Sequence, residues 1–333
     1  MRVLVTGSAG FVGFHVARRL LAEGHTVAGV DSMVPYYDVA LKQGRHAVLS
    51  ASASFRAHVL DIADNDALTR VIEDARPEVV IHLAAQAGVR YSLEHPESYL
   101  RSNVVGTFNL LELCRKHPVR HLLMASTSSA YGASTEMPFV ETQRADAPLT
   151  IYAATKRATE LMAHSTAHLW KQPITAFRFF TVYGPWGRPD MALFRFVKAA
   201  LEGQPIEVYG HGKQTRDFTY VDDLVEAIIR LIPAVPEVGQ PSCEGDSLSP
   251  VAPYRLVNIG AGTPIGLMDF VDAVERAVGR PIEKRMLDMQ PGDVPATWAD
   301  ATLLEALTGY RPATPVAEGV ARFVAWYRDY YRA

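Results

Sequence analysis

The stretch VLVTGSAGFVGFHVARRLL, residues 3–21, joins a short apolar run to an amphipathic segment through three regularly spaced glycines. The apolar run predicts a strand and the amphipathic segment predicts a helix, so the turn between them holds Gly7, Gly10 and Gly13. Backbone N–H groups at the start of such a helix suit a pyrophosphate, because the helix end carries partial positive charge. The stretch therefore predicts a phosphate-binding turn at the first crossover of a doubly wound α/β fold.

An acidic residue follows the second predicted strand. Residues 26–30 are apolar and lead directly into Asp31, whose carboxylate can accept hydrogen bonds from an adenosine ribose. The same carboxylate repels a 2′-phosphate, and the next two residues, Ser32 and Met33, supply no arginine to bind one. We therefore expect NAD rather than NADP. Other residues expected at the cofactor lie at the turn and at later strand ends: Phe11, Val12, Asp61, Ile62, Leu83, Ala84 and Ala85.

The first half of the chain alternates between strand and helix patterns. Short apolar runs predict strands at residues 2–5, 26–30, 55–60, 79–83, 121–125 and 174–179. Helical periodicity lies between them, at residues 11–23, 66–75, 99–115 and 152–170. Near-continuous Val, Ile and Leu strands separated by helices are typical of a mostly parallel sheet covered on both faces. We therefore expect a Rossmann domain at residues 1–180, completed by parts of 215–260.

The rest of the chain is less regular. It contains more proline and glycine and shorter helical patterns, at residues 192–202, 267–278, 301–307 and 316–330. This predicts a smaller mixed α/β lobe formed mainly by residues 181–333. Residues 233–253 are rich in Pro, Gly and Ser and read as a surface loop or insertion.

Composition excludes several classes of protein. The 333 residues are 48% hydrophobic and 21% charged, which suits a globular protein with a sizeable core. The net charge of −3 has no basic run behind it, so we expect no nucleic-acid partner. Cys114 and Cys243 lie far apart without metal-ligand spacing, which favours reduced thiols, no metal and a cytoplasmic location. No apolar run is long enough for a membrane span, and no targeting segment is recognisable.

The sequence YAATK, residues 152–156, places Tyr152 and Lys156 on one face of a predicted helix. A tyrosine with its ordinary pKa of about 10 is a poor base at neutral pH. A nearby ammonium and a positive nicotinamide ring would both favour the phenolate, and a pKa lowered by about 3 units corresponds to roughly 4 kcal/mol. This spacing is also common on solvated helices. The catalytic interpretation therefore depends on the glycine turn upstream.

Taken together, the glycine turn, Asp31, Thr127 and Tyr152-x-x-x-Lys156 resemble the extended short-chain dehydrogenase/reductases that epimerise or dehydrate sugar nucleotides. The resemblance covers nearly the whole chain. It implies that Tyr152 is the acid/base, that Lys156 binds the nicotinamide ribose and tunes the tyrosine, and that Thr127 binds the reacting sugar hydroxyl. It also implies a UDP-sugar substrate in the second lobe and a homodimer built on helices 99–115 and 152–170.

The stretch ASTSSAYG, residues 125–132, has four successive hydroxyl residues and no acid. In the family that the chain resembles, members that dehydrate or decarboxylate their sugar typically carry Asp or Glu one or two residues after the catalytic Thr. Here those positions are Ser128 and Ser129, which we expect to line the sugar pocket. A reaction that only removes and returns hydride at C4 needs no such acid, so simple epimerisation is favoured.

Two further stretches indicate the sugar. RFFTVYGPWGRPDMALF, residues 178–194, and QAGVRYS, residues 86–92, are similar to segments of UDP-glucuronate 4-epimerases. Arg188 can bind the C6 carboxylate of a uronic acid by charge-assisted hydrogen bonds, with neutral donors beside it. The remaining substrate contacts expected from the resemblance are Thr181 at the sugar, Arg216 at the diphosphate, Asp293 at the uridine ribose, and Arg90.

Other functions remain open from the sequence. Gln290 replaces an arginine found in many galactose epimerases, which leaves its contact with the diphosphate in doubt. The alternatives are epimerisation of neutral UDP-glucose and UDP-galactose, decarboxylation of UDP-glucuronate, and a non-catalytic NAD-sensing scaffold. The acids Asp222 and Asp223 are expected to cap a helix rather than to take part in catalysis.

Overall fold

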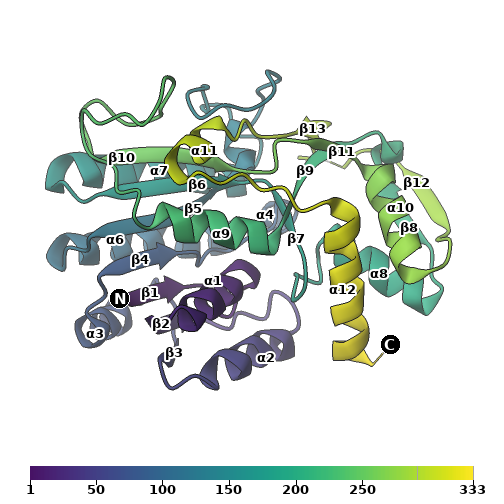
Figure 1. Cartoon of the computed structure of the whole chain (residues 1–333), viewed down its shortest axis with the longest axis horizontal. Coiled ribbons are helices and arrows are strands. Elements are labelled where there is room, and N and C mark those ends of the chain that lie inside the picture. The colour runs from purple at the N-terminus through teal and green to yellow at the C-terminus, as the bar shows by residue number, and fades with distance from the viewer. Residues whose placement is uncertain (291, 333) are drawn as a thin grey trace.

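A parallel sheet of seven strands forms the centre of the computed structural model, which describes residues 1–290 and 292–332 (Figure 1). Its strand order is β10-β6-β5-β4-β1-β2-β3. The strands are β1 (Arg2–Thr6), β2 (Thr26–Asp31), β3 (Phe55–Val59), β4 (Val79–His82), β5 (His121–Thr127), β6 (Ile174–Phe179) and β10 (Tyr254–Ile259). Because the order reverses between β1 and β4, the carboxyl ends of these two strands border a crevice. The predicted Rossmann-type fold class is confirmed.

Helices cover both faces of this sheet, as Figure 1 shows. One core cluster contains residues of α1 (Phe11–Ala22), α2 (Val39–Ser50) and α9 (Val221–Leu231). A second contains residues of α3 (Asn65–Ala75), α6 (Gly106–Lys116) and α7 (Ile151–Trp170). Strand β1 contributes to both clusters: Val3 and Val5 belong to the first, and Leu4 belongs to the second. Alternate side chains of a strand point to opposite faces, so a strand buried on both sides is apolar throughout.

Helix α2 was not predicted, because its buried face is largely polar. Lys42, Arg45 and His46 are all buried there beside Leu41 and Leu49. Hydrophobic periodicity detects a helix only where apolar residues mark the buried face. A helix whose inward side chains are cations and imidazoles is therefore invisible to that pattern.

The predicted helix at residues 99–115 is instead three consecutive segments. It comprises α5 (Pro96–Tyr99), a π-helical stretch (Leu100–Val105) and α6. Within the π-helical stretch, buried Asn103 donates from Nδ2 to the Gln86 carbonyl at 3.1 Å and to Thr155 Oγ1 at 3.1 Å. π-Helical turns are frequent at functional sites, and this one joins the loop after β4 to α7.

The second lobe packs three helices beside the sheet: α8 (Ala192–Glu202), α10 (Leu267–Val278) and α12 (Val316–Tyr331), at the right of Figure 1. Short strands complete it: β7 (Thr181–Tyr183), β8 (Ile206–Tyr209), β9 (Thr215–Tyr220), β11 (Pro264–Gly266), β12 (Lys284–Leu287) and β13 (Ala296–Thr297). Phe194, Phe270 and Phe323 belong to the same apolar cluster as Phe14 of α1. The two parts of the chain therefore share one continuous core. Among the described helices, none is both long and apolar enough to cross a membrane.

The acids at the start of α9 do not cap that helix. No side-chain cap bond forms there, and Asp223 instead accepts hydrogen bonds from the Tyr310 hydroxyl at 2.8 Å and the Thr314 N–H at 2.8 Å. Asp222 lies 3.8 Å from Arg18 of α1. The expected capping role is wrong because these carboxylates are used to hold neighbouring segments, namely α1 and residues 310–314 before α12.

Three buried histidines make the fold sensitive to acid. Burial lowers the pKa of His15 and His82 to about 3 and that of His121 to about 4, against an ordinary value of 6.5. The unfolded chain therefore binds more protons than the folded one below pH 6.5, so stability is complete above that pH and falls towards pH 4. Each histidine accounts for a loss of about 2 kcal/mol at pH 5. Burial raises the pKa of Glu141 to about 7, which offsets part of this loss, so we expect a net drop of the thermal midpoint between pH 6.5 and 5.

The neutral variant His121→Gln tests this origin. A glutamine amide can replace both ring contacts, to the Ile232 carbonyl and to Thr175 Oγ1, without titrating. We expect the midpoint of this variant to depend less steeply on pH than that of the wild type. An unchanged slope would assign the acid sensitivity to other groups.

Candidate active site

The glycine turn has no room for side chains. Gly7 has a φ of 74° and donates to the Val30 carbonyl at 2.7 Å, which presses the turn against β2. A Cβ on Gly7 would lie 2.8 Å from the backbone of Leu83 and Ala84, and one on Gly13 would lie 2.0 Å from the Gly7 carbonyl oxygen. The glycines thus let the start of α1 approach both the turn and the end of β4. The result is the kind of backbone cradle that a pyrophosphate requires.

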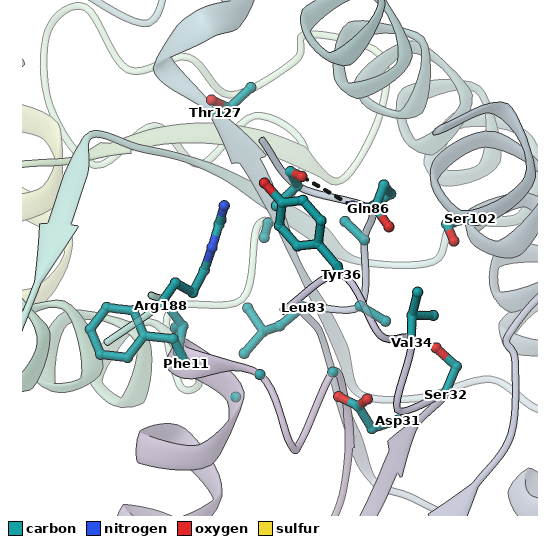
Figure 2. Close-up of a pocket in the computed structure, with 18 of the residues that line it drawn as sticks. Phe11, Asp31, Ser32, Val34, Tyr36, Leu83, Gln86, Ser102, Thr127 and Arg188 are labelled. Atoms are coloured by element: carbon teal, nitrogen blue, oxygen red, sulfur yellow. Dashed lines mark hydrogen bonds between the residues drawn. The ribbon is translucent and has the colours of Figure 1, made fainter. Parts of the chain in front are cut away.

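Asp31 fixes the same turn from the end of β2. It is 7% exposed, and its two carboxylate oxygens accept hydrogen bonds from the Ala9 N–H at 3.1 Å and the Met33 N–H at 2.9 Å. A carboxylate has about four acceptor positions, so these two bonds leave it able to accept from a ribose. Asp31 lies at the edge of the cavity in Figure 2.

One cavity of about 270 Å³ lies at the carboxyl ends of these strands. Residues that the sequence predicted account for half of its lining: Gly7, Gly10, Phe11, Val12, Gly13, Asp31, Asp61, Ile62, Leu83, Ala84, Ala85, Thr127, Tyr152, Lys156 and Arg188. Figure 2 shows Arg188 and Tyr36 side by side in this cavity, with Thr127 and Asp31 at opposite ends. The phosphate-binding turn and the chemical residues therefore share a single space.

Asp61 and Ile62 border the cavity from the segment after β3. Asp61 accepts a hydrogen bond from Arg101 Nε at 2.9 Å and another from the Ala63 N–H at 2.9 Å. Opposite them, the N–H groups of Leu83 and Ala84 both lie 3.2 Å from Thr6 Oγ1. Each strand end is therefore held by local hydrogen bonds while it lines the cavity.

Burial dominates the acid–base behaviour of Tyr152 and Lys156. Desolvation raises the pKa of Tyr152, and the side chain of Thr127 beside it partly offsets that rise. Desolvation also lowers the pKa of Lys156 to about 8, against the opposing effect of the Glu160 carboxylate. The protein groups by themselves therefore raise the pKa of Tyr152 and do not produce the expected lowering. A cation bound next to the phenol has to supply it.

The hydroxyl cluster divides into separate tasks. Thr127 ends β5, and its Oγ1 accepts the Ser129 N–H at 3.2 Å, which leaves the hydroxyl hydrogen to donate elsewhere. Ser126 donates to Glu160 Oε1 at 2.5 Å and so faces the interior. Ser128 and Ser129 begin a short 3-10 helix and line a neighbouring cavity of about 450 Å³, together with Asp293. Thr127 therefore lines the cavity of the glycine turn, whereas Ser128 and Ser129 line the neighbouring one.

A buried ion pair supports the end of β5. Glu160 and Arg178 have side chains that are 0% and 1% exposed and share two hydrogen bonds, at 2.9 and 2.8 Å. The Arg178 guanidinium also lies 4.3 Å from the centre of the Tyr131 ring. Because Ser126 donates to the same carboxylate, this pair fixes the strand immediately before Thr127.

Arg188 reaches the cavity from the segment after β7. Its side chain is 19% exposed and makes two hydrogen bonds to Asp190, from Nε at 3.0 Å and from Nη2 at 2.5 Å. Tyr36 donates to the same carboxylate at 2.9 Å. A guanidinium has five N–H donors, so the edge of Arg188 that does not face Asp190 can bind a second carboxylate. Thr181 lies close by and shares a small cavity with Arg188.

The residues expected at the nucleotide lie on the second lobe and on the loop after β4. Arg90 Nη2 donates to Asp293 at 3.2 Å, so these two predicted contacts bind each other across the opening. Arg216 donates to the carbonyls of Thr215, Val294 and Pro295 at 2.7 to 3.2 Å. These backbone acceptors carry no net charge, whereas the Asp293 carboxylate acts on this guanidinium from nearby. Pro291, which follows Gln290 in the sequence, lies outside the described residues.

Several lining residues were not among the predicted site residues. They are Val34, Tyr36, Tyr37, Lys42, Gln86, Ser102, Phe179 and Met191. The paired tyrosines of VPYYD are the feature that could have indicated an aromatic wall. In the described parts of the chain, no three His, Cys, Asp or Glu residues are grouped to hold a metal ion.

The fold is that of a Rossmann-type enzyme, and one cavity brings together the glycine turn and the tyrosine–lysine pair. The family model for the NAD dependent epimerase/dehydratase family matches residues 3–242. The chain belongs to that family, and the predicted cofactor, NAD, and the predicted resemblance are confirmed.

Individual relatives agree with this assignment. The chain is 59% identical over 335 residues to a probable UDP-glucuronate 4-epimerase of Rhizobium meliloti, covering 100% of this chain and 98% of that one. A UDP-glucuronic acid 4-epimerase of Bacillus cereus, solved with UDP-glucuronic acid and NAD, superimposes with a TM-score of 0.89 at 32% identity over 99% and 100% of the two chains. A UDP-glucose 4-epimerase of Thermotoga maritima gives a TM-score of 0.86 at 28% identity, again over 99% and 100%.

Proposed function

We propose that this enzyme interconverts UDP-glucuronate and UDP-galacturonate by epimerisation at C4 of the sugar. The observation that carries the proposal is Arg188, which enters the cavity that also holds Tyr152 and Thr127. Asp190 occupies one edge of the half-buried Arg188 guanidinium, and its other donors gain a second carboxylate only from a uronic acid, which presents one at C6. Similarity to relatives described as UDP-glucuronate 4-epimerases supports the same substrate.

The protein side chains divide the proton chemistry between them. Tyr152 as phenolate takes the proton of the sugar 4-hydroxyl, and Thr127 holds that hydroxyl by a hydrogen bond. Lys156, cationic below its pKa of about 8, stabilises the phenolate and binds the nicotinamide ribose. The close fit of Gly7 and Gly13 against neighbouring backbone suits the dinucleotide. When bound, NAD supplies a reversible hydride acceptor for C4.

The C6 carboxylate has to be restrained while C4 is a ketone. A 4-keto uronate is a β-keto acid, which loses carbon dioxide when its C5–C6 bond aligns with the carbonyl π system. Arg188 holds the carboxylate away from that alignment, assisted by the hydroxyls of Thr181, Ser128 and Ser129. The lack of an acid after Thr127 fits a reaction in which hydride is only removed and returned.

Proton NMR of the purified protein with UDP-glucuronate and NAD tests the proposal. The anomeric region is followed over time, with UDP-glucose as the parallel substrate. We expect UDP-galacturonate to accumulate without a pentose product and without net NADH. Turnover of UDP-glucose alone would assign the enzyme to neutral sugars, and release of carbon dioxide would assign it to decarboxylation. Full biological activity of a Tyr152→Phe variant would favour an NAD-sensing scaffold.

Replacing Arg188 is expected to affect both binding and product. Arg188→Ala removes a charge-assisted contact worth about 1.5 to 3 kcal/mol, so the KM for UDP-glucuronate rises at least about tenfold. The unrestrained keto acid then leaks carbon dioxide, which is measured as a 4-keto-pentose product by NMR. Arg195→Met, which removes an exposed arginine of α8, serves as the control. Unchanged KM and no pentose would show that Arg188 does not bind the carboxylate.

We also propose that the cofactor and the substrate bind to different lobes. Residues 1–180, with parts of 215–260, bind NAD, and residues 181–333 mainly bind the UDP-sugar. Arg216 neutralises the diphosphate, and its uncharged carbonyl partners support that role. Asp293 binds the uridine ribose after releasing Arg90, which then faces the nucleotide.

We propose that the enzyme is a cytoplasmic homodimer. The proposal of a dimer is supported by exposed apolar side chains on the helices expected to form the contact: Leu100, Val105, Phe108, Leu161, Leu169 and Trp170. Free cysteines are consistent with a reducing compartment. Sedimentation velocity on the wild type and on Phe108→Glu tests the contact. A wild type that sediments as a monomer at micromolar concentration would contradict it.

A further inference from the structure

Arg45 of α2 is fully buried and joins two segments that are far apart in the sequence. Its Nη1 donates to the Ala9 carbonyl at 2.8 Å and to the Tyr37 hydroxyl at 2.7 Å. Its Nη2 donates to the Trp186 carbonyl at 2.5 Å and lies 3.5 Å from the Gly187 carbonyl. One guanidinium thus connects the cofactor turn to the residues that immediately precede Arg188.

The segment that Arg45 holds is a tight turn. Trp186 has a φ of 61°, and the Gly187 N–H donates to the Gly184 carbonyl at 3.1 Å. A left-handed conformation costs a residue with a side chain about 1 to 2 kcal/mol, so surrounding contacts must hold it. The Pro185 carbonyl is bound by His15 Nε2 at 2.9 Å. Consecutive carbonyls of this turn are therefore held by side chains of α1 and α2.

The Trp186 ring anchors the turn from the other side. It lies 5.3 Å from Phe14 of α1, 5.5 Å from Trp326 and 4.9 Å from Tyr330 of α12, measured between ring centres. With the ring fixed by packing and the carbonyl fixed by Arg45, the backbone entering Arg188 has little freedom. The side chain of Arg188 then extends into the cavity, as Figure 2 shows.

We propose that Arg45 is a positioning residue that aims Arg188 at the sugar carboxylate, an inference that rests on the proposed function. Removing the Arg45 guanidinium takes this donor from the buried Ala9 carbonyl and from the half-buried Trp186 carbonyl, which favours a different backbone at the turn. Arg188 then moves relative to the carboxylate. UDP-glucose lacks that carboxylate, so its binding does not depend on where Arg188 points.

The test compares two ligands that differ only at C6. Calorimetric titration of the NAD-loaded protein with UDP-glucuronate and with UDP-glucose is performed in a Tyr152→Phe background, which prevents turnover. We expect Arg45→Met to weaken binding of UDP-glucuronate about tenfold and that of UDP-glucose less than about twofold. Arg188→Ala should show the same selective loss, and Arg195→Met should change neither affinity.

Other outcomes overturn the inference in distinguishable ways. Equal losses for both ligands in Arg45→Met would show a general structural role, and loss of NAD with unchanged selectivity would show a role in the cofactor turn. A selective loss in Arg188→Ala without one in the Arg45 variants would refute this inference alone. No selective loss in Arg188→Ala would refute the proposed role of Arg188 as well.

A conservative variant covers the case in which Arg45→Met does not fold. Arg45→Lys keeps the buried charge, but a single ammonium cannot reach both the Ala9 and the Trp186 carbonyls as a planar guanidinium does. We expect an intermediate and still selective loss for UDP-glucuronate, about threefold. Wild-type selectivity in this folded variant would overturn the proposal.

Discussion

Tyr152→Phe is expected to reduce kcat by about a hundredfold to ten-thousandfold while leaving the fold and NAD binding intact. General acid–base catalysis by a positioned side chain contributes typically 10²- to 10⁴-fold, and here the phenol is the group that handles the 4-hydroxyl proton. Desolvation by itself raises the pKa of Tyr152. The phenol therefore ionises near neutral pH only when a cation lies beside it. The measurement is the initial rate of UDP-galacturonate formation by NMR, with the NAD content of the variant measured in parallel.

A second tyrosine provides the matched control. Tyr254 is 8% exposed at the start of β10, which is the amino end of the sheet and opposite the cavity. Tyr254→Phe removes the same hydroxyl from a ring that does not line the cavity, and it should keep kcat within a factor of about two. Equal losses in both variants, or a Tyr152→Phe enzyme with more than about a tenth of the wild-type rate, would remove Tyr152 from the acid–base role.

The parts of the site that the sequence predicted are those set by backbone geometry. Gly7 and Gly13 have to be glycine because a Cβ would meet nearby backbone, and their regular spacing between a strand and a helix is what the sequence shows. Asp31 follows a strand in a fixed position of the fold. Tyr152 and Lys156 are four residues apart on one helix, so their proximity is decided by the helix itself.

The parts that were missed depend on contacts between distant segments. Arg45 lies on a helix with no apolar stripe, and its partners at Ala9 and Trp186 are carbonyls, which leave no trace in the sequence. Asp190 was visible next to Arg188, but only the structure shows the two hydrogen bonds between them. Short strands of the second lobe, such as β13, are likewise too brief for a pattern to emerge.

The acid-free hydroxyl cluster illustrates the same limit. The sequence presents four equivalent hydroxyls, and the resemblance could separate Thr127 from the rest. It could not show that Ser126 faces inward to a buried carboxylate, since Glu160 is 34 residues away and looks like an ordinary helix surface residue. A carboxylate, that of Glu160, is therefore in contact with the cluster although none is present in the stretch itself. It holds strand β5 in place through Ser126.

Glu160→Ala is expected to be the most destabilising single change in this region. Glu160 accepts from Ser126 and Arg178 in the interior and from Arg157 Nη1 at 2.8 Å at the surface. Its removal leaves Arg178, which is 1% exposed, as an uncompensated buried charge, and breaking a buried pair in this way costs about 3 to 5 kcal/mol. The urea midpoint and thermal midpoint should both fall sharply.

Two comparisons separate the buried charge from simple loss of contacts. Arg157→Ala removes the partner that is 30% exposed and should cost at most about 1 kcal/mol, as expected for pairs near the surface. The double variant Glu160→Leu/Arg178→Met removes both buried charges together and should recover much of the stability, because well-packed apolar residues often replace a buried pair without loss. If the double variant is as unstable as Glu160→Ala, the cost lies in the Ser126 contact and the packing of β5. In that case kcat should fall with stability, since Thr127 is carried by the same strand.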